Sequence, residues 1–204
     1  MVGPGEIFTI FFVTLGPLKV LGPFAQRTKE LDDAMVLQIA WRAFLVATIA
    51  IVAGAFIGRS LAENWKISLP AMLLTAGVIF FLVAIRQLLE QYEPVHAAAA
   101  APLPASPMAA ALRIIFPTVI TPYGVAAVIA LLASAANFQR VELIIGLLVA
   151  VMVLNLIAML MARRVMSGGT VVGLQLLGAI LGVLQVGLAI QIILGGLQHL
   201  GVIG

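Results

Sequence analysis

The sequence predicts an all-α integral membrane protein with six transmembrane helices, the first and fourth of them broken at Gly/Pro. Three observations carry this prediction. Hydrophobic residues make up 63% of the chain and charged residues 9%, which leaves too little polar surface to cover a soluble globule. Six apolar blocks each come close to the ~20 residues that cross ~30 Å of hydrocarbon. Clusters of glycine and proline interrupt the first block and the fourth.

The apolar blocks follow one another with short connections. They cover residues 7–24, 39–57, 69–88, 111–135, 143–162 and 171–197. The first block lacks a basic leader and a small-residue cleavage site, so we interpret it as a retained span rather than a signal peptide. Between the third and fourth blocks, residues 91–107 are rich in alanine and proline, a composition typical of a passive tether.

This tether divides the chain into two three-helix repeats, residues 1–90 and residues 108–204. Because three crossings are an odd number, the second repeat enters the membrane from the opposite side, which predicts an inverted topology. Basic residues gather at the first, third and fifth connections and are fewer at the second and fourth. The larger group is Arg27, Lys29, Arg42, Arg86, Arg113, Arg163 and Arg164, and the smaller is Arg59, Lys66 and Arg140. The positive-inside rule therefore places the linker 91–107 in the cytoplasm and both termini outside.

Helix-breaking residues occupy corresponding places in the two repeats. We expect Gly16-Pro17 and Gly22-Pro23 to interrupt the first span twice, and Pro117, Pro122 and Gly124 to interrupt the fourth. Each break frees backbone N–H and C=O groups, which within lipid must bond to protein, water or a ligand. Paired breaks indicate a transporter whose site lies where the broken helices meet. Kinks that serve packing alone are the alternative.

The candidate substrate-binding residues lie at or beside these breaks, with one addition from the last span. Inward-pointing helix N-termini suit a carboxylate and freed carbonyls suit an amine or cation, so a zwitterion such as an amino acid fits both. The threonine hydroxyls serve either a ligand or the backbone, and both interpretations stay open. The candidates are Thr14, Gly16, Pro17, Lys19, Thr118, Thr121, Pro122, Tyr123 and Gln191.

Lys19 is the unusual member of this set, because it lies between the two Gly/Pro pairs of the first span. An ammonium inside a membrane is costly unless it is paired or hydrated, and ionisable residues there are functional candidates. Lys19 either attracts an anionic group of the solute or supplies the positive charge that a coupling cation would otherwise bring. The alternative is that the span ends early and Lys19 reaches the headgroups.

The sequence lacks the residues that redox, metal-binding, nucleotide-binding and enzymatic sites need. The chain has no cysteine and two distant histidines, which argues against a redox or metal centre, and it has no phosphate-binding loop. The acidic residues lie at or beyond the span ends, so no paired-carboxylate or Ser/His/Asp constellation forms in the membrane. We therefore expect no enzymatic activity and no cofactor. The basic residues are scattered rather than gathered on one face, which argues against nucleic acid as a partner.

Four stretches of the chain resemble the MarC family of six-span inner-membrane proteins, which includes SnatA-type small neutral amino acid transporters. The similarity extends over essentially all six spans, and it implies a relation to the LysE-type exporter superfamily. It further implies a bacterial inner-membrane protein with two inverted three-helix repeats and no enzymatic activity, and it makes Gln191 a candidate; in such a membrane the outside termini expected from the basic residues are periplasmic. The matching stretches are residues 39–47, residues 76–86, Phe116-Pro117 with Thr121-Pro122, and Gly182 with residues 189–191 and Gly196.

The chain departs from the family pattern in its charges. The family usually shows an acid where Gly16 stands and a Gly-Asn pair where Lys19-Val20 stands, and many relatives carry Asp at the position of Gly195. Cation-attracting groups are thus lost and a cation is gained. We expect a variant that is uncoupled from sodium or that handles an anionic or carboxylate-bearing solute.

The predicted function is secondary transport of a small solute, an amino acid or related carboxylate, by alternating access. A non-transporting membrane scaffold or assembly protein is the alternative, and a channel ranks last because the spans lack a continuous polar lining. A homodimer also stays open, because Gly54-x-x-x-Gly58 and Gly178-x-x-x-Gly182 allow close approach of helices within or between copies.

Overall fold

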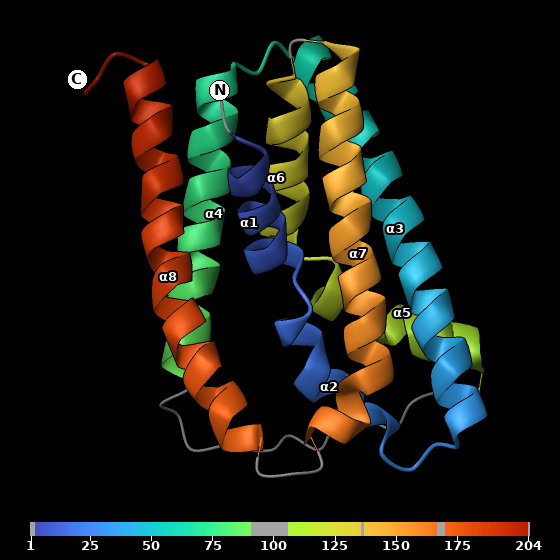
Figure 1. Ribbon diagram of the computed structural model, residues 1–204. Coiled ribbons are helices and arrows are strands. Elements are labelled where there is room, and N and C mark those ends of the chain that lie inside the picture. The colour runs from blue at the N-terminus through green and yellow to red at the C-terminus, as the bar shows by residue number, and fades with distance from the viewer. Residues whose placement is uncertain (1–2, 91–105, 136, 167–169, 204) are drawn as a thin grey trace.

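The computed structural model describes residues 3–90, 106–135, 137–166 and 170–203 of the chain. In this part of the chain the regular elements are helices, which form one bundle (Figure 1). Five helical segments are long and apolar enough to cross a membrane, and a shorter apolar helix covers residues 122–133. The predicted all-helical membrane protein is confirmed at this level. The sixth segment is short because the fourth predicted span is broken.

The helices appear in the order expected from the apolar blocks. The first span consists of α1 (Pro4–Leu15) and α2 (Leu18–Thr28), and α3 (Asp33–Asn64) and α4 (Leu69–Glu90) follow. The fourth consists of α5 (Pro107–Ile114), the π-helix η1 (Ile115–Val119) and α6 (Pro122–Ala133), and α7 (Phe138–Met166) and α8 (Thr170–His199) complete the chain. The predicted linker 91–107 lies almost entirely outside the described residues.

The N- and C-termini lie at the same end of the bundle (Figure 1). We call it the terminal end, and we call the opposite end, where α3 begins and α4 finishes, the linker end. Which end faces the cytoplasm stays a prediction. At the linker end Arg163 of α7 donates to Asp33 Oδ1 at 2.9 Å and to the carbonyls of Thr28 and Leu31. These bonds tie α7 to the connection between α2 and α3.

The first span breaks once, at Gly16-Pro17. Gly16 has an extended backbone (φ −72°, ψ 164°), and Pro17 has no N–H to continue the hydrogen bonds of α1. The predicted second break is wrong, because α2 runs through Gly22 and Pro23. Pro23 is exposed whereas Phe24 beside it is buried. The proline ring therefore has room outside the packed core, and the helix continues past it.

The fourth span breaks twice. Phe116 is extended inside η1 (φ −108°, ψ 127°), the conformation that a residue before proline favours. A second interruption lies at Ile120 and Thr121, which are also extended, and Pro122 then begins α6. The expectation that Gly124 breaks the helix is wrong, because it lies inside the first turn of α6. The reason for this glycine is the close approach of another helix.

The buried apolar side chains form two large clusters, one on each side of the breaks. Helices α3 and α7 contribute to both, whereas α1 and α6 contribute to the terminal-end core and α2, α5 and η1 to the linker-end core. The terminal-end core includes Ile7, Phe11, Ile51, Val128, Leu132 and Leu148. The linker-end core includes Val20, Phe24, Ile39, Ile114, Val119 and Met159.

Helices α4 and α8 lie side by side as a pair at one side of the bundle (Figure 1). Two glycines allow this close packing. A Cβ atom on Gly77 would lie 2.6 Å from Ile193 Cγ1, and one on Gly196 would lie 2.9 Å from Leu74 Cγ. Both distances are shorter than van der Waals contact, so larger residues would force the two helices apart.

Candidate functional site

The two breaks meet at mid-depth, where side chains of the second half bond carbonyls freed in the first. Thr121 Oγ1 donates to the Thr14 carbonyl at 3.1 Å, and Asn155 Nδ2 of α7 donates to the Leu15 carbonyl at 2.7 Å. These two carbonyls belong to the last turn of α1 and have lost their helical partners to the break. Thr121 also accepts from the Gly124 N–H at 3.2 Å and so caps α6. Side chains of the second half therefore bond the two carbonyls that the break in the first span leaves free.

Lys19 and Tyr123 form a second link between the broken helices. The Lys19 ammonium donates to the Tyr123 hydroxyl and also lies 4.5 Å from the centroid of the tyrosine ring. Tyr123 is 2% exposed and stacks on Phe80 of α4 with ring centroids 5.2 Å apart. The hydroxyl and the ring face both stabilise a cation in a poorly hydrated place. The predicted alternative in which Lys19 merely reaches the headgroups is disfavoured by this inward contact.

Two glycines permit the backbone to come this close. A Cβ atom on Gly16 would lie 1.5 Å from the Phe12 carbonyl oxygen, which no side chain can tolerate without a shift of the backbone. A Cβ atom on Gly124 would lie 2.3 Å from Leu15 Cδ2. Gly16 therefore fixes the geometry of the first break, and Gly124 lets the end of α1 lie against α6.

A small space of about 20 Å³ lies beside Lys19 at the N-terminus of α2. No side chain of the described residues caps this terminus, so the first amides of α2 carry the partial positive charge of a helix start. Gln185 of α8 also lines the space; it is 7% exposed, and its Oε1 atom is buried without a hydrogen-bond partner among the described residues. An ammonium, a helix start and an amide thus converge on one point.

A groove between α1 and α8 leads away from this space, and we call it the α1–α8 groove. It has a volume of about 630 Å³ and shares Phe12, Val13 and Leu181 with the small space. Most of its lining is apolar, and polar groups come from Thr9 and Gln191 at the other end. Both residues also line a neighbouring cavity of about 670 Å³, which lies nearer the terminal end.

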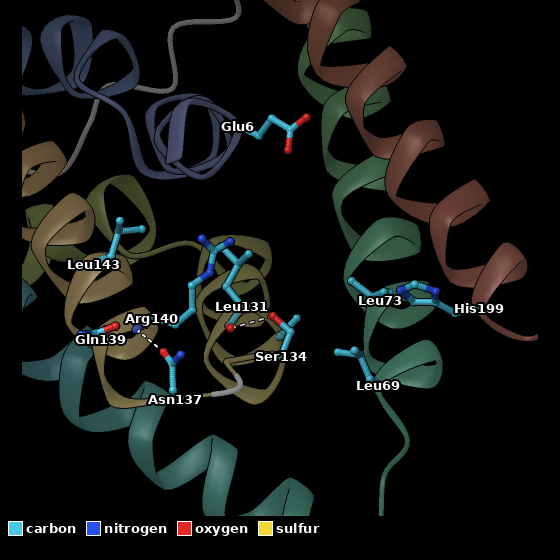
Figure 2. A pocket seen from close by; sticks show the side chains of 11 residues that line it. Glu6, Leu69, Leu73, Leu131, Ser134, Asn137, Gln139, Arg140, Leu143 and His199 are labelled. Carbon is cyan, nitrogen blue, oxygen red and sulfur yellow. Dashed lines mark hydrogen bonds between the residues drawn. The ribbon is translucent and has the colours of Figure 1, made fainter. Parts of the chain in front are cut away.

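The outermost cavity opens at the terminal end, and we call it the terminal mouth. It has a volume of about 760 Å³ and shares Glu6, Leu73 and His199 with the cavity below it. Figure 2 shows Glu6 of α1, Arg140 of α7 and His199 of α8 around this mouth. Charged groups thus surround the outer end of the cavity series, and apolar walls lead from there to Lys19.

The structure gathers some of the predicted substrate-binding residues at the breaks and separates others. The gathered group is Thr14, Gly16, Pro17, Lys19, Thr121 and Tyr123. Thr118, half-buried on η1, and Pro122, exposed at the start of α6, also lie at the breaks of the fourth span, whereas Gln191 lies apart, exposed on α8 and lining the α1–α8 groove. The hydroxyls of Thr14 and Thr121 donate to backbone carbonyls. Binding of a solute by any of these residues stays a prediction.

Some residues of the site were not candidates from the sequence. Phe80 lies in an uninterrupted apolar run and carries no signal that it stacks on Tyr123. Asn155 of α7 bonds the first span, and the sequence does not indicate the freed Leu15 carbonyl as its partner. The sequence likewise does not indicate that Gln185 lies beside Lys19.

The described residues contain no group of three His, Asp or Glu side chains that could hold a metal ion. In comparisons with known proteins, a family model described as MarC family integral membrane protein matches residues 5–200. No curated protein and no solved structure matches the chain.

Proposed function

The chain belongs to the MarC family of integral membrane proteins, and we propose that it is a secondary transporter of a small solute. The solute is an amino acid or a related carboxylate, and it crosses the membrane by alternating access where the two broken helices meet. Broken helices at mid-depth are the usual site in transporters built from repeats. The single observation that carries the proposal is the series of neighbouring cavities with shared lining residues between the terminal mouth and Lys19.

The proposal includes two inverted repeats, residues 1–90 and residues 108–204. In support, the order of elements is the same in both: a broken span is followed by two long helices. The resemblance to inner-membrane proteins and the distribution of basic residues support a bacterial inner membrane, with periplasmic termini and a cytoplasmic linker. The terminal mouth would then open to the periplasm, and the linker-end core would close the path to the cytoplasm.

We propose the α4–α8 pair as the moving part. Its two helices pack closely on each other at Gly77 and Gly196, and cavities lie between α8 and α1. A tightly packed pair can move as a rigid body, and here it would move against its contact with α6, where Phe80 stacks on Tyr123. Rocking toward α1 would close the α1–α8 groove from the terminal end.

One observation favours the second candidate function, a non-transporting scaffold. The breaks are closely packed, and the space beside Lys19 is about 20 Å³, room for roughly one water molecule. A transporter must open this junction during its cycle, whereas a scaffold keeps it closed. The two candidates therefore differ in whether α8 moves relative to α1.

Cross-linking in proteoliposomes tests the proposal, and the native chain helps because it contains no cysteine. Phe12→Cys and Leu181→Cys place two thiols on opposite walls of the same space. We expect counterflow of radiolabelled alanine or lactate in the unmodified protein, loss of that flux when a bifunctional reagent joins the thiols, and recovery when a cleavable reagent is reduced.

The matched control joins α4 to α8 through Leu74→Cys and Gly196→Cys. Leu74→Cys removes Leu74 Cδ2, one of the atoms that a Cβ on Gly196 would meet, so the two thiols can lie side by side, and a cross-link between them should leave the flux unchanged if the pair moves as one body. Absence of flux of either solute from the unmodified protein would refute transport of this solute class and favour the scaffold. Flux that persists after α1 is joined to α8 would refute the proposed motion.

A further inference from the structure

We propose that the space beside Lys19 and the α1–α8 groove together bind an aliphatic monocarboxylate, with its carboxylate at Lys19 and its hydrocarbon body in the groove. The inference rests on the proposed function and names the solute class. The proposed ligand differs from a zwitterionic amino acid because it has no ammonium group, and the structure bears on whether such a group would find a partner.

The inner end of the groove is built for an anion. The Lys19 ammonium, the uncapped start of α2 and the Gln185 amide line one space. Each can donate a hydrogen bond or offers positive charge, and the two ends of the Gln185 amide exchange when the group rotates by half a turn. Gln185 is 7% exposed and its Oε1 has no partner among the described residues, so no bond to that oxygen opposes a half-turn of the amide that would let Nε2 donate to a carboxylate.

No carboxylate accompanies these donors. Among the described residues, no Asp or Glu lines either the small space or the α1–α8 groove, and Glu6 lies at the cavities nearer the terminal end. An ammonium group on the solute would therefore lose its hydration without gaining an ionic partner. The charge of the site selects a solute with one negative group and no positive group.

The groove itself selects an apolar body. Phe12, Val13, Leu181 and Leu188 contribute to its walls, and its volume of about 630 Å³ is within the range of small-molecule sites. A chain of several methylene groups lying there would lose contact with water, at about 0.8 kcal/mol for each group. The Lys19 ammonium has three N–H donors, so it can bond a carboxylate while it keeps its bond to the Tyr123 hydroxyl.

Three ligands that share a six-carbon skeleton test this inference with the protein in lipid nanodiscs. Hexanoate carries the carboxylate alone, hexanamide replaces it by a neutral group, and norleucine adds an ammonium. We expect hexanoate to raise the apparent Tm and to bind measurably by calorimetry, norleucine to bind about tenfold more weakly or less, and hexanamide to give no shift. A site in which hexanamide or norleucine equals hexanoate is not the one proposed.

Two variants locate the binding. Lys19→Met and Gln185→Leu should each weaken hexanoate binding by about tenfold or more, since each removes a bond to a charged group. Lys66→Met is the matched control, because Lys66 is exposed at the end of α3, and it should bind hexanoate as the unmodified protein does. If Lys19→Met does not fold, Gln185→Leu decides the question by itself. Hexanoate affinity that neither substitution changes would overturn the inference.

This experiment separates failure of the inference from failure of the proposed function. Alanine flux that is stopped by the α1–α8 cross-link, together with no hexanoate binding, would leave the transporter standing and remove the monocarboxylate. Lys19-dependent hexanoate binding without flux of any solute tested would keep the anion site and remove the transporter.

Discussion

Thr121→Val is the sharpest probe of the contact between the two breaks, because valine has nearly the shape of threonine and lacks its hydroxyl. That hydroxyl donates to the Thr14 carbonyl at 3.1 Å and accepts from the Gly124 N–H at 3.2 Å. Loss of a helix cap costs about 1 kcal/mol. A buried carbonyl left without its partner costs about 1–3 kcal/mol in water-soluble proteins, and bonds between membrane helices are worth about 0.6 kcal/mol on average. We therefore expect a loss of about 2 kcal/mol.

For a chain of this length, 1 kcal/mol corresponds to roughly 2–4 °C in Tm, so Thr121→Val should lower the apparent Tm by roughly 4–8 °C. The measurement is thermal unfolding of the purified protein in one detergent at one scan rate. Thr75→Val is the matched control: the Thr75 hydroxyl donates to the Ala71 carbonyl at 2.9 Å, but the residue is exposed and bonds only within its own helix. Its Tm should change by about 1 °C or less. Equal Tm values for the two variants would refute the view that Thr121 joins the breaks.

The glycines give two further predictions. Gly16→Ala should destabilise the protein by about 3 kcal/mol or more, because its Cβ would lie 1.5 Å from a backbone carbonyl oxygen. The control is Gly146→Ala, where a Cβ meets nothing within 4 Å, and its stability should be unchanged or slightly raised. A similar yield and Tm for both variants would contradict this prediction. Gly77→Leu should lower the Tm, because the new side chain would push α4 away from Ile193 of α8. Gly187→Leu should keep the Tm, because a Cβ there meets nothing within 4 Å, and should obstruct hexanoate binding, because Gly187 lines the α1–α8 groove. A normal Tm for Gly77→Leu, or normal binding by Gly187→Leu, would show that the packing or the groove is described wrongly.

Much of the fold could be predicted because the membrane imposes simple rules on a sequence. Apolar length gave the spans, and proline gave the break at Gly16-Pro17 and those beside Pro117 and Pro122. The same rule failed at Pro23, where α2 continues although the proline has no N–H to donate to the carbonyl four residues earlier. A proline in the sequence marks a lost hydrogen bond, but it does not say whether the helix ends there.

The candidate site was predicted in part, for a related reason. Thr14, Lys19 and Thr121 could be selected because polar residues beside breaks stand out in an apolar chain. Their partners could not, since Thr121 and Thr14 are 107 positions apart and Asn155 and Leu15 are 140 apart. Such pairings depend on the depth at which the two halves meet. The α1–α8 groove could not be predicted either, because a cavity depends on where the packed helices leave space between them.

The division of the buried side chains into two cores has a mechanical consequence. Only the backbones of α3 and α7, among the described helices, carry buried residues of both cores without a break at the boundary. The two broken spans cross this level through Gly16 or through Ile120 and Thr121, where the chain is not helical, whereas α4 and α8 run past it unbroken. Helices α3 and α7 thus connect the two cores rigidly. A rotation of one core relative to the other would bend the unwound segments first and leave the packing within each core unchanged.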